Sequence, residues 1–397
     1  MSSRTVVISG ASIAGPALAF WLHRRGMRPV VVERAPQLRP GGQTVDIRGA
    51  GETVARLMGI EDAIRAGSTG EEGLRFLDTA ERTKAVFPSS VFSGKGFVTE
   101  LEILRGELSA LLYERTRDHA EYVFGDEISG VTEDGERLRL TFTSGAEREA
   151  DLLVAADGIR SRTRDLIFGD STRIRSRGLY TAYFTIPRHP SDGSWARWYN
   201  FPGGKTAMLR PDNLGTTRAL MSFLSPPYGY DRLHQEEQKE LIRHTFAGEG
   251  GPVPRMLREM RDCGDFYLEG VAQVHMPQWW RGRVAAVGDA AYCASPLSGM
   301  GTNLALVGAY ILAGELATHD DHHHAFTAYE NAMRPYVTQA QDLPPGTPRL
   351  AMPRTQLGIK ALHTVLRTAS TPLAGRVMRR FLVPAAYDFV LPAYPTR

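Results

Sequence analysis

The stretch TVVISGASIAGPALAFWLHRRG near the N-terminus constrains the fold more than any other part of the sequence. A short apolar run at residues 4–9 ends in Gly10, and apolar residues with helical spacing follow from residue 13 to residue 26. A second apolar run, PVVVE at residues 29–33, completes a βαβ unit of about 30 residues. Buried, uninterrupted apolar strands of this kind are typical of parallel sheets, so the sequence predicts an α/β fold. Helical spacing also predicts helices over residues 53–65 and 101–117.

The turn between the first strand and the helix has the features of a dinucleotide-binding turn. Its first glycine permits a sharp turn and its last allows the helix to approach the sheet, but Ser12 stands where a middle glycine is usual. A serine hydroxyl can bind a phosphate oxygen, and the helix N-terminus adds free N–H groups. Glu33 ends the second strand. It follows the turn by about 20 residues, which is the sequence spacing expected of a ribose-binding carboxylate. We therefore expect the turn to bind a pyrophosphate through Gly10, Ser12, Ile13, Ala14 and Gly15.

Two other interpretations of this turn fit less well. A hydrolase turn requires the pattern Gly-x-Ser-x-Gly, but its fifth position here is Ala14, and Glu33 has no role in such a site. A purely structural turn would leave two further motifs unexplained. One is the strand LLVAADGIRSR, which ends in Asp157-Gly158, and the other is RVAAVGDAAYCASPLSGMGTNLAL, which passes through Gly288-Asp289 into a glycine-rich loop and a helix. Ligands of open α/β sheets bind at the carboxyl ends of the strands, so three strands bring turn motifs to one edge.

Residues 176–275 have a different pattern, in which aromatic residues alternate with small and polar ones, as in LYTAYFTI and ARWYNF. Such alternation predicts a largely antiparallel sheet inserted into the parallel fold. We expect a nucleotide-binding domain at residues 1–72, 99–175 and 276–342, a β-rich substrate domain at 73–98 and 176–275, and a C-terminal connector and helix at 343–397.

Composition excludes several other classes of protein. The chain has 397 residues, and 47 basic against 44 acidic residues give a net charge of +3, which does not indicate a nucleic-acid partner. No uncharged stretch reaches the roughly 18 residues of a membrane span, and because a strand-like run follows the N-terminus at once, we expect no secretory leader. The two cysteines, Cys263 and Cys293, indicate reduced thiols in the cytoplasm. The run HDDHHH at residues 319–324 is more typical of a solvated segment than of a metal site, so we expect no metal.

Together these motifs resemble the class A FAD-dependent aromatic monooxygenase family, of the para-hydroxybenzoate hydroxylase type. The resemblance extends over residues 1–340 as scattered motifs. Within the family the chain is most similar to tetracycline-inactivating and antibiotic-tailoring monooxygenases, through its opening turn, the loop GGQTVDIRGAG at residues 41–51 and the ending Leu-Pro-Ala-Tyr at residues 391–394.

The resemblance implies an α/β, Rossmann-like FAD-binding domain interrupted by a β-rich substrate domain, with a C-terminal helix. It implies non-covalent FAD, NADPH or NADH as a transient co-substrate, and O₂, which forms a flavin hydroperoxide that hydroxylates an aromatic or polyketide-like small molecule. The protein would act as a monomer or homodimer. Baeyer–Villiger insertion and flavin-dependent oxidation remain alternatives on the same fold, and a non-catalytic nucleotide-binding module is an alternative of another class.

By position, the resemblance assigns roles around the cofactor. Glu33 would bind the adenosine ribose, Arg34 would lie against the adenine or its ribose, and Arg105 would contact the ribityl and phosphate region. Asp157 and Gly158 would take part in binding both FAD and the nicotinamide. Asp289, after Gly288, would bind the ribityl hydroxyls. The helix that follows would direct its positive N-terminus at the flavin pyrimidine edge, where reduced flavin is negative. The residues expected beside the isoalloxazine are Pro296, Gly299, Gly301, Thr302 and Asn303.

The substrate side is less defined by the sequence. In the loop at residues 41–51, Gln43, Asp46 and Arg48 are candidates to contact flavin or substrate. The aromatic residues of the β-rich segment could line an apolar pocket or belong to the core, because apolar residues at strand spacing are commonly core. These candidates are Tyr183, Trp198, Phe201 and Phe223. No catalytic acid or base can be named from the sequence.

Overall fold

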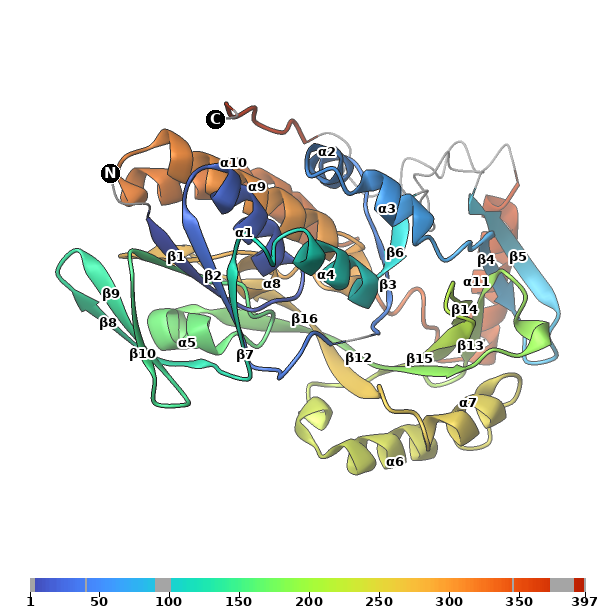
Figure 1. Cartoon of the computed structure of the whole chain (residues 1–397). Coiled ribbons are helices and arrows are strands. Elements are labelled where there is room, and N and C mark those ends of the chain that lie inside the picture. The colour runs from blue at the N-terminus through green and yellow to red at the C-terminus, as the bar shows by residue number, and fades with distance from the viewer. Residues whose placement is uncertain (1–3, 40, 90–100, 345, 372–388, 396–397) are drawn as a thin grey trace.

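The protein is described by a computed structural model that covers residues 4–39, 41–89, 101–344, 346–371 and 389–395. Its first sheet has six strands: β1 (Thr5–Ser9), β2 (Arg28–Glu33), β7 (Glu121–Phe124), β11 (Leu152–Ala155), β17 (Trp280–Arg281) and β18 (Val284–Ala286). They lie in the order β17-β18-β11-β1-β2-β7, and only β17 runs antiparallel to its neighbour. Figure 1 labels β1, β2 and β7 of this sheet. The predicted parallel sheet is therefore present.

Different layers cover the two faces of this sheet. On one face, Val6, Ile8 and Val154 pack with α1 (Ala14–Arg24), α9 (Gly301–Thr318) and α10 (His322–Gln341) in the largest apolar cluster. On the other, Val7 and Val30 pack on a three-stranded sheet. Both rows of side chains are apolar because each strand is buried on both faces. The strands of the small sheet are β8 (Ile128–Asp134), β9 (Arg137–Phe142) and β10 (Glu147–Ala150).

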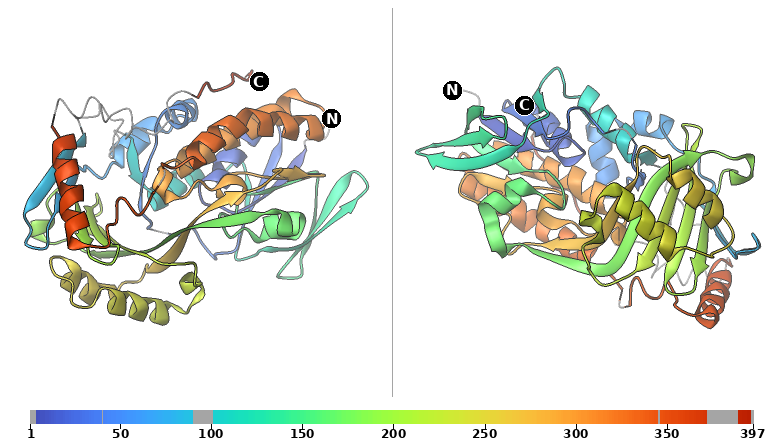
Figure 2. Two further views of the ribbon diagram at one scale, coloured as in Figure 1. Left: turned by 180° about the vertical axis from the view of Figure 1, so that it is seen from behind. Right: turned by 90° about the horizontal axis from the view of Figure 1, so that it is seen from below.

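A seven-stranded sheet forms the β-rich part of the molecule. Its strands are β4 (Gly73–Leu77), β5 (Thr83–Pro88), β12 (Arg173–Pro187), β13 (Ala196–Phe201), β14 (Lys205–Pro211), β15 (Thr216–Leu224) and β16 (Tyr267–His275). They lie in the order β16-β12-β15-β14-β13-β4-β5, antiparallel except between β13 and β4. Helices α6 (Gln235–Thr245) and α7 (Val253–Met260) cover one face (Figure 2, right). The predicted α/β fold with a β-rich insertion is confirmed.

Short elements connect the two sheets. A two-stranded antiparallel sheet joins β3 (Thr44–Asp46) to β6 (Glu102–Leu104). The remaining α-helices are α2 (Ala50–Leu57), α3 (Glu61–Ala66), α4 (Arg105–Glu114), α5 (Arg162–Phe168), α8 (Asp289–Tyr292) and α11 (Gln356–Ala369). Single 3₁₀ turns lie at η2 (Gly169–Ser171), η3 (Pro190–Asp192), η4 (Tyr230–Arg232) and η5 (Pro296–Ser298).

Two helix predictions were wrong in their bounds. The pattern predicts one helix over residues 53–65, but α2 and α3 are separate because Gly59, with φ +67°, interrupts them. The pattern also predicts a helix from Leu101, yet residues 102–104 form β6, and α4 begins only at Arg105. Pairing with β3 outweighs the local helical spacing there.

The C-terminal part spans both halves of the molecule. The predicted helix α11 packs against β5 and β13, at the edge of the large sheet (Figure 2, left). Residues 389–395 lie instead on α9, where the Tyr394 hydroxyl donates to Glu315 Oε1 at 2.6 Å. A Cβ on Gly314 would lie 2.4 Å from the Tyr394 ring, so this glycine makes room for the tail. Residues 90–98 of the predicted substrate domain lie outside the described residues. None of the described helices is long and apolar enough to cross a membrane.

Candidate active site

The turn after β1 requires both of its glycines. Gly10 has φ +108°, and a Cβ on it would lie 2.6 Å from the Ala156 carbonyl oxygen. A Cβ on Gly15 would lie 1.9 Å from the Gly10 carbonyl oxygen. Helix α1 begins here with Ile13 at its N-cap, and no side chain of the described residues caps it. Its first N–H groups are therefore available for an anion.

Ser12 lies at this helix start and is held by α4. Its Oγ accepts a hydrogen bond from Arg105 Nη2 at 2.9 Å. The Ser109 hydroxyl donates to the carbonyl oxygens of Ala11 and Ser12, at 3.3 and 3.0 Å. Ile13, Ala14 and Gly15 are buried, whereas Ser12 is half-buried and Arg105 exposed. The structure thus brings Arg105 to the predicted phosphate position, 93 residues away in the sequence.

Glu33 contacts the turn directly. Its Oε2 accepts the Ala11 N–H at 3.0 Å, and its Oε1 accepts the Ala35 N–H at 2.9 Å. The carboxylate therefore shapes the turn and still has further lone pairs for ribose hydroxyls. Arg34, the predicted contact of the adenine or its ribose, follows it on the exposed surface.

The Asp157-Gly158 motif lies beside the turn. One Asp157 oxygen accepts the Ser161 hydroxyl, and the other accepts the Thr163 N–H at 3.2 Å, at the start of α5. Burial raises the pKa of Asp157 in spite of these bonds. Gly158 has φ +85°. Asp157 thus orders its own loop, and its position next to Gly10 brings that loop to the same edge.

The Gly288-Asp289 motif completes this edge. Gly288 has φ +65°, and a Cβ on it would lie 3.0 Å from the Ala14 Cβ, so this strand end lies against α1. Asp289 is the first residue of α8; its side chain is exposed, yet burial by the surrounding protein raises its pKa.

The loop after α8 leads into α9 without a capping side chain. Pro296 begins η5, Gly299 has φ +64°, and Gly301 begins α9, with no side-chain cap among the described residues. Thr302 and Asn303 follow in the first turn and are buried. Asn303 Oδ1 accepts the Arg48 N–H at 2.8 Å. Asn303 is therefore used to hold the neighbouring loop.

That loop, residues 41–51, lies against the start of α9. Asn303 Nδ2 donates to the Asp46 carbonyl oxygen at 3.1 Å, and Arg48 pairs with the Asp46 carboxylate at 2.6 Å. A Cβ on Gly51 would lie 2.2 Å from Asn303 Oδ1, so the contact is close. Gln43 Oε1 is buried without a hydrogen-bond partner in the described part of the chain. The three polar candidates of this loop therefore lie beside the predicted flavin position.

The large sheet divides the four aromatic candidates between its two faces. Phe201 and Phe223 belong to the core under α6 and α7. Tyr183 and Trp198 lie at the alternate positions and point to the opposite face, which we call the open face. Tyr183 stacks on Tyr267 of β16 with ring centroids 4.8 Å apart. Tyr183 is itself buried against Tyr267, and Trp198 packs with Phe76 and Leu366 in a smaller apolar cluster under α11, so a role of these four residues in substrate binding stays a prediction.

The open face also carries charged groups that the sequence did not indicate. Arg210 binds Glu71 at 2.9 Å and Glu102 at 3.0 Å, and both carboxylates are buried. Burial raises the pKa of Glu71 to about 7 although Arg210 opposes this, and it raises the pKa of Glu102. Arg218 binds Asp212 at 2.8 Å and lies 3.6 Å from the Cβ position of Gly41. The open face thus meets the loop at residues 41–51 and β6.

A second overlooked group is Glu269 on β16. It is half-buried, and burial together with Asp289 raises its pKa to about 7, while Arg105 opposes this. The signal in the sequence was the alternation Tyr-Leu-Glu at residues 267–269, which places Leu268 in the core and its two neighbours on the open face.

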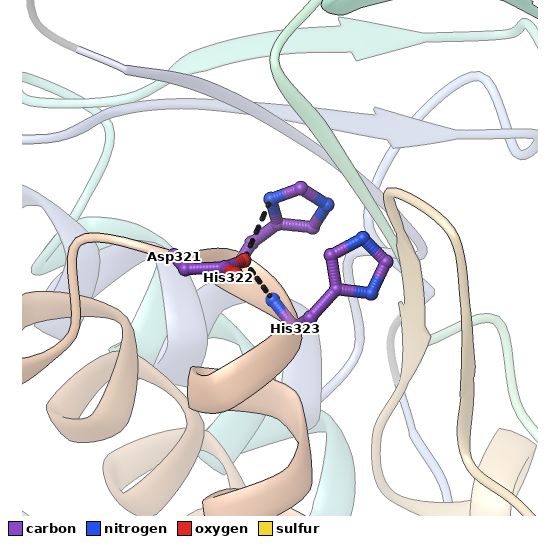
Figure 3. Close-up of side chains that lie close together, drawn as sticks. All are labelled: Asp321, His322 and His323. Atoms are coloured by element: carbon purple, nitrogen blue, oxygen red, sulfur yellow. Dashed lines mark hydrogen bonds and ion pairs between the residues drawn. The ribbon is translucent and has the colours of Figure 1, made fainter.

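Away from this site, the histidine run begins α10 (Figure 3). Asp321 Oδ1 accepts the His323 N–H at 2.8 Å and so caps the helix. Ligand-type atoms of Asp321, His322 and His323 lie within 4.8 Å of one another. The cap explains the carboxylate's position without a metal, and the absence of a metal stays a prediction.

The site fits FAD on grounds of its own geometry. Two glycines leave room beside uncapped helix N–H groups, as a pyrophosphate requires. Arg105 lies at the same point, and Asp289 offers a carboxylate to hydroxyl groups farther along the edge.

Comparison with known proteins agrees with this geometry. The model of the family described as "FAD binding domain" matches residues 3–343. The chain belongs to the FAD-dependent monooxygenase family. It is 35% identical to the FAD-dependent monooxygenase asL4 of Sarocladium schorii, over 100% of this chain and 99% of that one. It is 36% identical to a flavin-dependent monooxygenase of Legionella longbeachae serogroup 1 (strain NSW150), over 85% and 86% of the two chains.

Solved structures show the same fold. The crystal structure of tetracycline destructase Tet(51) superposes with a TM-score of 0.82 at 30% identity, over 99% of this chain and 100% of that one. The predicted membership of the FAD-dependent monooxygenases, and with it an enzymatic rather than a purely binding role, is confirmed. The individual cofactor and substrate residues of this monooxygenase stay predictions.

Proposed function

We propose that the protein uses NAD(P)H and O₂ to hydroxylate an aromatic or polyketide-like small molecule between its two sheets. The observation that carries this proposal is the meeting of two surfaces. The loop at residues 41–51, which Asn303 holds at the start of α9, meets the face that presents the Tyr183–Tyr267 pair: a Cβ on Gly41 would lie 3.6 Å from Arg218. The likeness to a tetracycline destructase, whose name identifies a polycyclic substrate, supports a substrate of this class.

The first task of the chain is to hold the cofactor. The N–H groups at the start of α1 and the Arg105 guanidinium would bind the pyrophosphate, and Glu33 the adenosine ribose. Asp289 would accept hydrogen bonds from the ribityl hydroxyls. Bound FAD supplies the redox chemistry, because it accepts a hydride from NAD(P)H and reacts with O₂.

The second task is to stabilise negative charge and orient the substrate. The uncapped N-terminus of α9 would lie at the flavin pyrimidine edge, and Gly299 and Gly301 allow close approach of the backbone. Asn303 keeps the loop at residues 41–51 against this helix start. Tyr183, Tyr267 and Trp198 would bind the flat faces of the substrate and exclude water.

A screen of aromatic and polyketide compounds tests this proposal. The purified protein with FAD is mixed with NADH or NADPH without oxygen, and the rate of loss of absorbance near ~450 nm, a property of the cofactor, is measured with each compound. A true substrate should accelerate reduction, and under ¹⁸O₂ its product should gain one ¹⁸O atom. Reduction with no oxygen incorporated would contradict monooxygenation and favour simple oxidation. Insertion of the oxygen into a carbon–carbon bond would favour the Baeyer–Villiger alternative.

A further inference from the structure

Glu269 lies on the substrate-side sheet but faces the nucleotide-binding motifs. On β16 it lies opposite Thr181 of β12, and Tyr267 and Glu269 share one face of the strand. The intervening Leu268 packs in the core under α6 and α7. At the next position, a Cβ on Gly270 would lie 3.2 Å from both Asp231 Oδ2 and the Tyr180 ring. These contacts fix the strand, and with it the direction of the Glu269 side chain.

The charges around Glu269 come from both halves of the molecule. Its strand lies against the end of α8, which Asp289 begins: the Val274 N–H donates to the Cys293 carbonyl oxygen at 3.0 Å, and Cys293 Sγ donates to the Ala272 carbonyl oxygen at 3.7 Å. In agreement, Asp289 and Arg105 of the nucleotide-binding part act on the pKa of Glu269. From the other side, Tyr183 and Tyr267 interact with the same carboxylate. Arg160, Asp231 and Cys293 also interact with this carboxylate.

Glu269 differs from Asp192, a structural carboxylate in η3 beside the same sheet. Asp192 is fully buried and is bonded to Arg255 at 2.7 Å and to the Thr217 hydroxyl at 2.9 Å. Although burial opposes it, these bonds lower the pKa of Asp192 to about 2. Glu269 has no hydrogen-bond or ion-pair partner within the described residues, and its side chain is only half-buried. A carboxylate that serves only the fold would be paired, because leaving it unpaired is costly.

We propose that Glu269 is a further cofactor-binding residue, whose carboxylate accepts a hydrogen bond from a ribityl hydroxyl of FAD opposite Asp289. The inference rests on the proposed function, which places the cofactor along this edge. The ribityl chain is the part of FAD that offers several hydroxyl donors in a row. Asp289 would bind it from the nucleotide-binding part and Glu269 from the substrate-side sheet, so that FAD binding would join the two sheets.

The test compares Glu269→Ala and Glu269→Gln with the wild-type protein. A charged hydrogen bond contributes enough that the alanine variant should bind FAD at least about tenfold more weakly. Affinity is measured by equilibrium dialysis for three probes: FAD, riboflavin and lumichrome. Riboflavin keeps the ribityl chain and lacks the phosphates, so its affinity should fall by the same factor as that of FAD. Lumichrome has the ring without the ribityl chain, so its affinity should not change.

Thermal unfolding of the cofactor-free variants separates binding from folding. Removing an unpaired, half-buried carboxylate should leave the melting temperature unchanged or raise it, while FAD affinity falls. A merely structural residue would lower both. If the alanine variant does not fold, FAD affinity and melting temperature are compared in the glutamine variant, which keeps the shape of the side chain. The matched control is Glu236→Gln on α6, whose side chain is 82% exposed, and it should change none of these values.

The outcomes are distinct. Equal FAD affinity in wild-type protein and Glu269→Ala overturns the inference but leaves the proposed function intact. Weaker FAD binding with unchanged riboflavin binding also overturns it, because the contact would then lie outside the ribityl chain. If wild-type protein binds no FAD, the proposed function fails, and the inference fails with it.

Discussion

The edge of the six-stranded sheet and the open face of the seven-stranded sheet bind by different means. The edge is built from backbone: Gly10 and Gly15 make room, and the helix starts supply N–H groups. The open face is built from side chains, among them Tyr183, Trp198 and Arg210. Close approach of the backbone to a ligand requires glycine at fixed positions. A binding surface made of side chains can keep its fold with many different residues at each position. The first region can therefore serve one cofactor in many proteins, and the second can be adapted to a particular substrate.

The largest expected effect tests the backbone side of this comparison. Gly15→Val would place a side chain where even a Cβ lies 1.9 Å from the Gly10 carbonyl oxygen. We expect a loss of at least about 3 kcal/mol in the free energy of unfolding, together with loss of FAD binding. Chemical denaturation measures the first quantity. The control is Gly264→Ala, because a Cβ there has no neighbour within 4 Å and the backbone is unstrained. Equal stability of the two variants would contradict the account of the turn.

Neighbouring residues of β16 distinguish the two faces of the large sheet. Leu268→Ala should cost about 2–4 kcal/mol of stability, because it removes a core side chain under α6 and α7. Tyr267→Ala should cost clearly less, since Tyr267 is 38% exposed, but it should raise the KM for the substrate. Denaturation and steady-state kinetics of both variants provide the comparison. If the tyrosine variant loses as much stability as the leucine variant, the open face is part of the core.

The raised carboxyl pKa values predict how stability depends on pH. Glu269 and Glu71 each have a pKa of about 7 in the folded protein, against an ordinary value of 4.5. Between these pH values the folded state binds more protons than the unfolded state, so the stability of the cofactor-free protein should fall as pH rises. Glu269→Gln should remove part of this slope. Denaturation at several pH values measures it, and a slope identical to that of the wild type would show that Glu269 titrates normally.

The smallest effect is expected at the surface between the two regions. Arg160, three residues after Asp157, pairs with Asp231 of η4 on the substrate side. Asp231→Asn should cost less than about 1 kcal/mol, because Arg160 is 54% exposed and such pairs are screened. The effect should shrink further in 1 M salt. A larger loss, insensitive to salt, would indicate that this pair holds the two sheets together.

The sequence predicted the edge well because its requirements are local. Positive φ at Gly10 and Gly288, and the strand-turn-helix order around them, follow from short stretches of chain. The same local reasoning failed at Leu101–Leu104, where pairing with β3 converts a helical pattern into a strand. Local reasoning also predicted one helix where α2 and α3 are separate, because a helical pattern does not reveal that Gly59 adopts a positive φ.

The open face could not be derived from composition. Phe201 and Trp198 belong to the same strand, and only the register of the sheet decides that Phe201 packs under α6 and α7 and Trp198 on the other face with α11. In β12 that register shifts between Ser176 and Tyr180, which no residue type announces. Arg210 meets Glu71 and Glu102 over 139 and 108 residues of sequence, so this cluster is visible only in the folded chain.

FAD affinity of two Ser12 variants tests the central claim most directly, namely that this turn binds the cofactor's pyrophosphate. Ser12 stands where a glycine is usual, and its half-buried side chain points to Arg105. Ser12→Gly should therefore bind FAD within about threefold of the wild type, whereas Ser12→Leu should bind at least about 100-fold more weakly. Fluorescence titration with FAD measures both. Wild-type affinity in the leucine variant would show that the pyrophosphate lies elsewhere.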